Sequence, residues 1–246
     1  MIPKVIYQIG SGPFLRKLHQ LNPEFSVQVL TDANCTSFIA RHGDRGEWVA
    51  YSSLRPGAPR ADLCRMALLK YRGGFYIETD VEMLAPLRTL PVNTSTFITG
   101  YHWPFEFIGS VANHSIIRRV LQVQVTNIMR EVKNIGTSLA CRSSHSCVIR
   151  VTGPLAYSSA VGDVTHARGC TNRHRLPHGR DCRHAKDKEL RDMHVCAMNR
   201  SNPYRTYSCG VARHWDCRNS GSQRRCGRTH YSKKREFFWK SPVGLL

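Results

Sequence analysis

The stretch of sequence that decides the fold spans residues 59–87 and reads PRADLCRMALLKYRGGFYIETDVEMLAPL. Its first half predicts a helix of about ten residues, capped by Asp62 and ended by the glycine pair at 73–74, since glycine adopts the left-handed C-terminal conformation at little cost. The apolar run at 75–77 then predicts a short buried strand. Helix, glycine turn and strand in this order are typical of an α/β sheet.

Two acidic residues follow the predicted strand. Glu78 and Asp80 lie on the same face of an extended chain, because successive side chains alternate. Open α/β sheets bind ligands at the carboxyl ends of their strands. Carboxylate oxygens are the ligands that Mg²⁺ and Mn²⁺ prefer. The pattern therefore predicts a site for a divalent metal and a phosphate group.

The pattern of strands and helices continues on both sides of this stretch as far as residue 160. Each predicted strand is a short apolar or alternating run, and each predicted helix has an apolar face or a capping signal. The predicted strands are 5–9, 25–30, 96–99 and 107–110, and the predicted helices are 14–20, 31–41, 115–132 and 154–160. The fold class is therefore α/β. Over residues 163–235 the apolar period fades and we predict no elements.

The charge divides the chain into two parts. The 246 residues carry 36 Lys and Arg against 17 Asp and Glu, a net charge of +19. Residues 161–246 hold 19 of the basic and 7 of the acidic residues, so most of the excess lies there. We predict a core domain over 1–162 and a basic, Cys/His-rich region over 163–246 that partly completes the site or is poorly ordered. With 41% hydrophobic residues, the chain is not wholly disordered.

Eight of the ten cysteines, Cys141, Cys147 and the six of the basic region, have three interpretations. They form disulfides in an oxidising compartment, they bind zinc with nearby histidines such as Cys170/His174 and Cys226/His230, or the region is poorly structured. Spacing alone does not decide between these. Four N-x-S/T sequons are compatible with glycosylation in a lumen: Asn34, Asn93, Asn113 and Asn199.

Several motifs, in order, resemble glycosyltransferase family 32, whose sugar-binding region contains a DXD motif and which includes initiation-specific α-1,6-mannosyltransferases and α-1,4-galactosyltransferases. The segment IPKVIYQI resembles the family's opening IPK-x-IHQIW, ADLCR its [SA]D-x-x-R, YRGGFYIETD its YxxGGxYxDxD and VEMLAPL its VE-x-L-x-PL. The matching segments are 2–9, 61–65, 71–80, 81–87, the strand 107–110 and the TGP at 152–154. The resemblance implies a GT-A, Rossmann-like fold that binds a nucleotide sugar with Mn²⁺ or Mg²⁺ and retains the donor's anomeric configuration.

The resemblance also implies the roles of individual residues. Asp62, Arg65, Glu78 and Asp80 are the implied catalytic set. Asp62 and Arg65 would contact the hydroxyls and phosphate of the donor sugar, where the planar guanidinium suits bidentate binding. Asp80 would ligate the metal directly, and Glu78 would face the ribose and the metal, directly or through water.

Three further site residues come from the two ends of the chain. Tyr7 and Gln8, on the opening strand, would approach the nucleotide. His214, in the segment ARHW, resembles the family's C-terminal histidine and is the implied third metal ligand, with His230 as its rival. The implied partners are a nucleotide-sugar donor carrying mannose, galactose, glucose or N-acetylglucosamine and a glycan or glycolipid acceptor, and no specific nucleic acid.

The sequence departs from the family at two positions of the site. Glu78 replaces the usual first Asp of the motif, and Gly10 replaces the tryptophan after IHQI. One extra methylene shifts a carboxylate by about an ångström, a misplacement that can cost on the order of 100-fold in rate. A catalytically weakened pseudo-glycosyltransferase is therefore an alternative. The other alternative is a basic, Cys/His-rich nucleic-acid-binding protein, although no RRM, KH, helix-turn-helix or homeodomain signature occurs.

The family works in the Golgi or another secretory-pathway lumen, and we expect that location here. No secretory signal opens the chain and no apolar run approaches the roughly 18 residues of a membrane helix. We therefore expect the targeting segment to be missing from this sequence. Membrane association would then come from an anchor that is absent from this chain, or weakly from the basic region.

Overall fold

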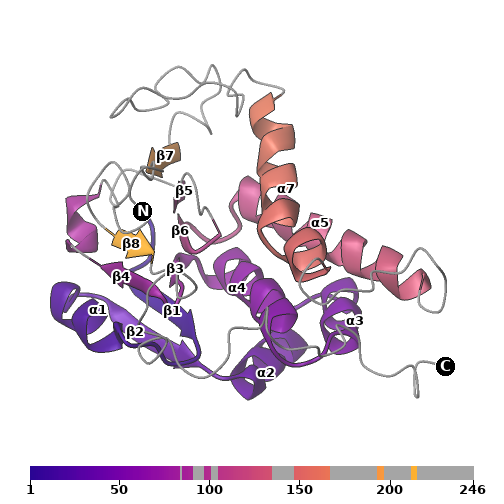
Figure 1. The fold of residues 1–246 in the computed structure, drawn as a ribbon, viewed down its shortest axis with the longest axis horizontal. Coiled ribbons are helices and arrows are strands. Elements are labelled where there is room, and N and C mark those ends of the chain that lie inside the picture. Colours follow the sequence, from indigo (N-terminus) through magenta and orange to yellow (C-terminus); the bar gives the residue numbers. More distant parts are fainter. Residues whose placement is uncertain are drawn as a thin grey trace, which may run out of the picture.

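The computed structural model describes residues 1–83, 85–90, 97–100, 105–134, 147–166, 193–196 and 212–214. Figure 1 shows the strands between two layers of helices. The strands are β1 (Val5–Ile9), β2 (Ser26–Leu30), β3 (Gly74–Ile77), β4 (Val81–Met83), β5 (Phe97–Gly100), β6 (Phe107–Ser110), β7 (Met193–Cys196) and β8 (Ala212–His214). The helices are α1 (Leu15–Leu21), α2 (Asp32–His42), α3 (Arg45–Ser53), α4 (Ala58–Arg72), α5 (Ser115–Lys133) and α7 (Pro154–His166), with a 3₁₀ turn at Leu87–Thr89 and a π-helical turn, η2, at Val148–Thr152.

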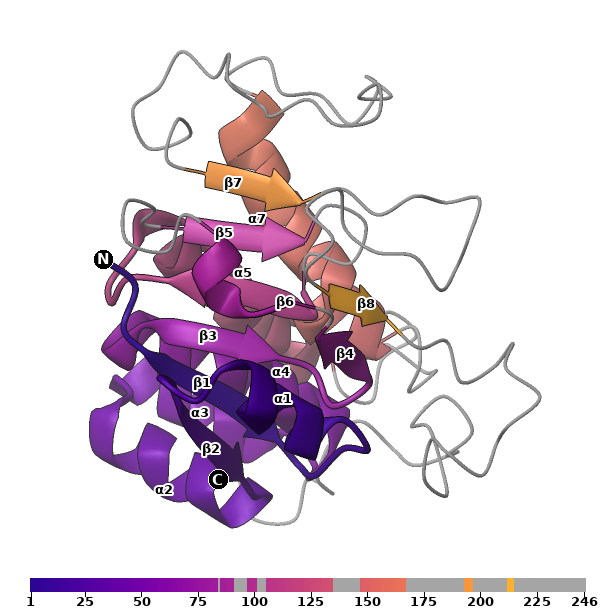
Figure 2. The same ribbon diagram turned by 90° about the vertical axis from the view of Figure 1, so that its left-hand side faces the viewer.

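The main sheet has the strand order β2-β1-β3-β6-β5-β7 (Figure 2). Strand β1 is parallel to both β2 and β3, whereas β6 is antiparallel to both β3 and β5. Strand β7 runs parallel to β5. The predicted α/β class is confirmed, and the parallel core β2-β1-β3 consists of strands that the sequence pattern predicts.

Alternating side chains divide the buried residues between the two faces of the sheet. Ile6, Phe75 and Phe107 pack with Leu18 of α1 on one face. On the other face, Tyr76 and its strand neighbours join the larger core beneath α2, α3, α4 and α5. Figure 2 shows α1 in front of the sheet and these four helices behind it. Helix α4 thus lies directly against the strand that precedes the two acids.

Helix α4 begins earlier than the sequence predicts. It runs for 15 residues from Ala58, after Gly57, and Asp62 lies buried within it. The prediction that Asp62 caps the helix is wrong, because its carboxylate has more distant partners, described below. The predicted end is confirmed: Gly73 has a φ of +66°. A β-carbon on Gly74 would overlap the Val5 side chain, so the turn into β3 requires glycine at this point.

Helix α3 is absent from the sequence prediction. Its N-terminus is a capping box in which the Asp44 side chain accepts a hydrogen bond from the Glu47 backbone N–H and the Glu47 side chain accepts one from the Asp44 backbone N–H. Such reciprocal bonds satisfy donors that a helix start leaves open. Helix α3 packs against α5 and α2 and so extends the helical layer.

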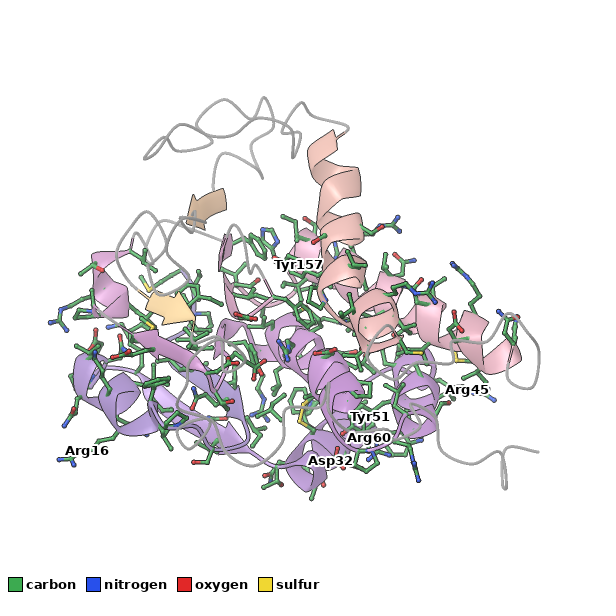
Figure 3. The ribbon with its side chains drawn as sticks, in the orientation of Figure 1. Arg16, Asp32, Arg45, Tyr51, Arg60 and Tyr157 are labelled. Carbon is green, nitrogen blue, oxygen red and sulfur yellow. A yellow bond between two sulfur atoms is a disulfide. The ribbon has the colours of Figure 1, made fainter. Side chains whose placement is uncertain are left out.

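Helices α2, α3 and α4 are joined by a disulfide and a buried cation. Cys35 of α2 is bonded to Cys64 of α4. Arg60 pairs with Asp32 at 2.9 Å and stacks 4.8 Å from the centre of the Tyr51 ring. These three side chains gather at the foot of α4 in Figure 3. Burial raises the pKa of Tyr51 to about 12, so its hydroxyl is protonated at neutral pH. The first half of α4 is thereby fixed in place.

The basic C-terminal region contributes backbone to both sheets. Strand β7 pairs with β5, and β8 pairs antiparallel with β4, which places His214 opposite Val81. The sequence predicted neither strand. The boundary at residues 162–163 stays a prediction. The interpretations of the cysteines after residue 160 concern side chains outside the described ones, and His230 lies outside the described residues. In the described part of the chain, no helix is long and apolar enough to cross a membrane.

Candidate active site

The two acids occupy a tight turn at the carboxyl end of β3. The Glu78 backbone N–H donates to the Glu106 carbonyl at 2.8 Å, which continues the pairing of β3 with β6. The Val81 N–H then donates to the Glu78 carbonyl at 3.1 Å and closes a turn that contains Asp80. Because β1 is parallel to β3, its carboxyl end lies at the same edge of the sheet. The turn thus stands where α/β sheets bind ligands.

Arg65 connects helix α4 to this turn. Since α4 leads directly into β3, its first half lies over the carboxyl end of that strand. The Arg65 guanidinium contacts Glu78 Oε2 at 2.7 Å and Asp62 Oδ1 at 3.0 Å through the same nitrogen, Nη2. Its Nη1 donates to the Phe105 carbonyl at 2.8 Å. The structure therefore brings together three of the four residues of the predicted catalytic set around one cation.

The same guanidinium lies between two aromatic rings. Its central carbon is 4.3 Å from the Tyr76 ring centre and 4.2 Å from that of Phe105. The Arg65 side chain is only 6% exposed. Its pKa is raised above the usual arginine value because the surrounding anionic groups outweigh the cost of burial. Arg65 is thus a permanent, desolvated positive charge, held rigidly next to the acidic turn.

Asp62 is buried and has a partner on each carboxylate oxygen. Oδ1 faces Arg65, and Oδ2 accepts a hydrogen bond from the Thr152 hydroxyl at 2.8 Å. Gln124 of α5 donates to the carbonyl oxygens of both Asp62 and Thr152. Burial raises the pKa of Asp62 to about 6, against the opposing effects of Arg65 and Thr152. Asp62 therefore titrates close to neutral pH in the folded protein.

Glu78 is directed inward by its partners. Besides Arg65, its Oε2 accepts a hydrogen bond from the Tyr76 hydroxyl at 3.0 Å, while Oε1 faces the Thr79 backbone N–H at 3.3 Å. Burial is the main cause of the raised pKa of Tyr76, so this phenol stays protonated as a donor. The extra methylene of glutamate allows the carboxylate to reach back over the turn to Arg65.

Asp80 is the acid of this turn that does not pair with Arg65. It is therefore the described candidate ligand for a divalent metal. Asp80 is half-buried, and β8 carries His214 to a backbone position opposite Val81, the residue after Asp80. Carboxylate and imidazole are suitable ligands for Mn²⁺. Among the described side chains, no group of three His, Cys, Asp or Glu forms a complete metal site. The donor types at the turn fit a divalent metal, and the Glu78 carboxylate is held by Arg65 and Tyr76.

The two predicted nucleotide-contacting residues of β1 have different environments. Tyr7 is 1% exposed and packs in the larger core. Burial raises the pKa of its hydroxyl, an effect that nearby Arg72 opposes. Gln8 is also buried, and its Nε2 donates to the Glu78 carbonyl at 3.4 Å. Its Oε1 has no hydrogen-bond partner among the described residues. Of the two, Gln8 is the residue that lies at the turn.

Residues 14–97 match the family described as "Glycosyltransferase sugar-binding region containing DXD motif". This segment of the chain is a glycosyltransferase sugar-binding region. The match contains Asp62, Arg65, Glu78 and Asp80, so the predicted family is confirmed across the acidic turn and the helix that supports it. Regions of this family bind a divalent metal through the DXD motif.

No curated protein matches the chain. Among solved structures, "PaToxG Glycosyltransferase" is similar, with 16% sequence identity and a TM-score of 0.49 over 68% of this chain and 70% of that one.

Sequence reasoning identified the acids and the arginine of this glycosyltransferase region but missed their supports. Thr152 stands in the TGP segment that carried the resemblance, yet nothing in its spacing shows that it bonds to a residue 90 positions earlier. Tyr76 belongs to the YxxGGxYxDxD pattern. The available signal was strand alternation, which puts Tyr76 and Phe75 on opposite faces of the sheet. The Phe105 carbonyl leaves no signal in the sequence, because any residue supplies one.

Proposed function

We propose that the protein is a metal-dependent, retaining glycosyltransferase that transfers a hexose from a nucleotide sugar to a glycan or glycolipid acceptor. The observation that carries this proposal is the buried ion cluster in which Arg65 joins Asp62 to Glu78 beside Asp80, at the carboxyl end of β3. An arrangement of this kind is costly to bury and stabilises a fold only weakly. Its position inside the segment of the DXD family supports a role in donor binding.

The diphosphate of the donor is the group that such a site would neutralise. A Mn²⁺ or Mg²⁺ ion held by Asp80, with His214 as a further ligand, would offset the negative charge that develops on the leaving diphosphate. Glu78 would act through water or towards the ribose, because Arg65 and Tyr76 already occupy its Oε2. Arg65 supplies a fixed positive potential that does not depend on pH in the working range.

Gln8 is the described residue best placed to recognise the nucleotide part of the donor. Its buried Oε1 is an acceptor without a partner in the described structure, and leaving such a group unpaired costs about 1–3 kcal/mol. A ribose hydroxyl or a base N–H would satisfy it. Asp62 and Arg65 are only 4% and 5% exposed. In this conformation they would therefore support the residues that line the sugar subsite from beneath and would not contact the sugar themselves.

We also propose a secretory-pathway lumen, such as the Golgi, as the place of action. The buried Cys35–Cys64 bond supports this, because disulfides persist in oxidising compartments and are rare in the cytosol. Cys147 is also disulfide-bonded. Contact with the membrane would come from the basic region.

The experiment is a thermal-shift and hydrolysis screen of the purified chain. UDP-glucose, UDP-galactose, UDP-N-acetylglucosamine and GDP-mannose are each tested with Mn²⁺, with Mg²⁺ and with EDTA. A ligand that binds only the folded state raises the melting temperature with occupancy, so the donor is identified by its shift. Asp80→Asn should abolish the metal-dependent part of the shift and the hydrolysis. Asp44→Asn, which keeps the cap of α3, is the matched control.

Three outcomes separate the functions under consideration. A metal-dependent shift with hydrolysis supports the transferase. A shift without hydrolysis of any donor indicates a pseudo-glycosyltransferase that binds its ligand. The absence of any shift in folded protein, together with salt-dependent binding of RNA that Asp80→Asn leaves unchanged, overturns the proposal in favour of a nucleic-acid-binding protein.

A further inference from the structure

We infer that residues 8–17, which lead from β1 into α1, act as a brace that positions the acidic turn, residues 78–82, for metal binding. This inference rests on the proposed function and assigns positioning roles to Gly12 and Lys17, which lie outside the predicted site. The two segments are in contact at three points, which follow the same order along each segment. These points are Gln8 with Glu78, Gly12 with Thr79, and Lys17 with Glu82.

The central contact is between backbones. A β-carbon on Gly12 would overlap the Thr79 carbonyl oxygen and lie 2.8 Å from the Thr79 β-carbon and 2.9 Å from its carbonyl carbon. Real β-carbons essentially never approach backbone atoms this closely, and a backbone atom cannot rotate away as a side chain does. Thr79 is the residue between Glu78 and Asp80. Any larger residue at position 12 must therefore displace the backbone that carries both acids.

The outer contact fixes the far end of the turn. Lys17 Nζ lies 2.7 Å from Glu82 Oε1, and the Glu82 side chain is only 9% exposed. Glu82 belongs to β4, where it is opposite Arg213 of β8, the residue before His214. The Lys17 ion pair thus holds strand β4, which pairs with β8 and places the backbone of the candidate histidine opposite Val81, the residue after Asp80. The partly buried carboxylate makes this pair stronger than a fully exposed one.

The inner contact ties the brace to the nucleotide side of the site. Gln8 of β1 donates a hydrogen bond to the Glu78 carbonyl, so β1 contacts the turn at the end opposite to Glu82. A turn held at both ends and pressed in the middle has little freedom to move its carboxylates. A catalytic metal site needs this rigidity, because a misplacement of about 1 Å can cost on the order of 100-fold in reaction rate.

The test compares two variants with two matched controls. Gly12→Ala adds the single β-carbon that the turn excludes, and Gly46→Ala adds one in α3, where the nearest atom is the Asp44 side-chain oxygen at 3.3 Å and no backbone atom is as close. Lys17→Met removes the ion pair and keeps the length of the side chain. Arg16→Met changes the exposed neighbour on α1, at the edge of the molecule in Figure 3.

The readouts are the dissociation constant for Mn²⁺ by electron paramagnetic resonance, the melting temperature of the metal-free protein, and the metal concentration for half-maximal donor hydrolysis. We expect Gly12→Ala to weaken Mn²⁺ binding by roughly 10- to 100-fold and Lys17→Met by roughly two- to fivefold. The two controls should bind as the wild type does. Circular dichroism and the melting temperature establish that each variant is folded.

The outcomes distinguish this inference from the proposed function. If the wild type binds Mn²⁺ and both folded variants bind it equally well, the brace has no positioning role and the inference fails alone. If Gly12→Ala does not fold, Lys17→Met decides the question by itself. If the wild type binds neither Mn²⁺ nor a nucleotide sugar, the proposed function fails and this inference fails with it.

Discussion

Replacing Thr152 with valine removes one hydroxyl group from the most buried part of the site. The hydroxyl donates to Asp62 Oδ2 at 2.8 Å, and neither residue is more than 4% exposed. Valine has nearly the same shape, so the change deletes a hydrogen bond without opening a cavity. Hydrogen bonds to charged groups contribute about 1.5–3 kcal/mol. We therefore expect Thr152→Val to lower the free energy of unfolding by about 2 kcal/mol near pH 7.5.

The size of this loss depends on pH. Burial raises the pKa of Asp62 from 3.8 to about 6. An acid with a higher pKa in the folded state binds its proton more tightly when folded, so its contribution to stability is greatest below about pH 4 and falls as the pH rises through about 6. The Thr152 hydroxyl stabilises the ionised carboxylate. Its removal raises the pKa of Asp62 further and destabilises the fold most above about pH 6.

Urea unfolding near pH 7.5 and near pH 4.5 measures both effects. The loss should be about 2 kcal/mol at the higher pH and clearly smaller at the lower one, where Asp62 is protonated. Thr126→Val, at an exposed position of α5, should change the free energy by no more than about 0.5 kcal/mol. An equal loss for Thr152→Val at both pH values would refute the ionised carboxylate as the acceptor.

Three further changes probe the rest of the site and its support. Arg65→Met leaves the Asp62 and Glu78 carboxylates without their cation and should cost about 3–5 kcal/mol in urea unfolding, with part of the loss recovered at pH 5 as Asp62 protonates. Glu78→Asp withdraws the carboxylate from Arg65, so donor hydrolysis should fall roughly tenfold or more; a gain in activity would instead mark the wild type as a weakened enzyme. Replacing Cys35 and Cys64 with serine should lower the free energy of unfolding by about 3–4 kcal/mol, and the wild type in reducing agent should show a similar loss.

The parts of the fold that the sequence predicts correctly are those whose signals are local. The alternation in β2, the Thr31 cap of α2 and the glycine at the end of α4 each depend on residues within one turn or strand. Helix α3 had such a signal as well, in the Asp44 and Glu47 capping box, and the prediction overlooked it.

The errors and omissions share a physical cause in long-range contacts. Asp62 looks like an N-cap, yet its buried carboxylate is bonded to Thr152, and the N-cap of the helix is Gly57, five residues earlier. Strand β8 has three residues and pairs with β4 across about 130 positions, which no local period indicates. The acids of the site were predictable from the motif, whereas the choice of Glu78 as the partner of Arg65 depends on how α4 packs on the sheet.

The Cys35–Cys64 bond also makes part of the chain tolerant of cutting. It closes a covalent loop over a sequence separation of 29 that contains the end of α2, all of α3 and the start of α4. A protease that cleaves after the exposed Arg45, at the start of α3 inside this loop, would leave two fragments linked through sulfur. Such a nicked protein would migrate as one species without reductant and as two with it. Trypsin digestion can therefore report, on a gel, whether the bond has formed in a given preparation.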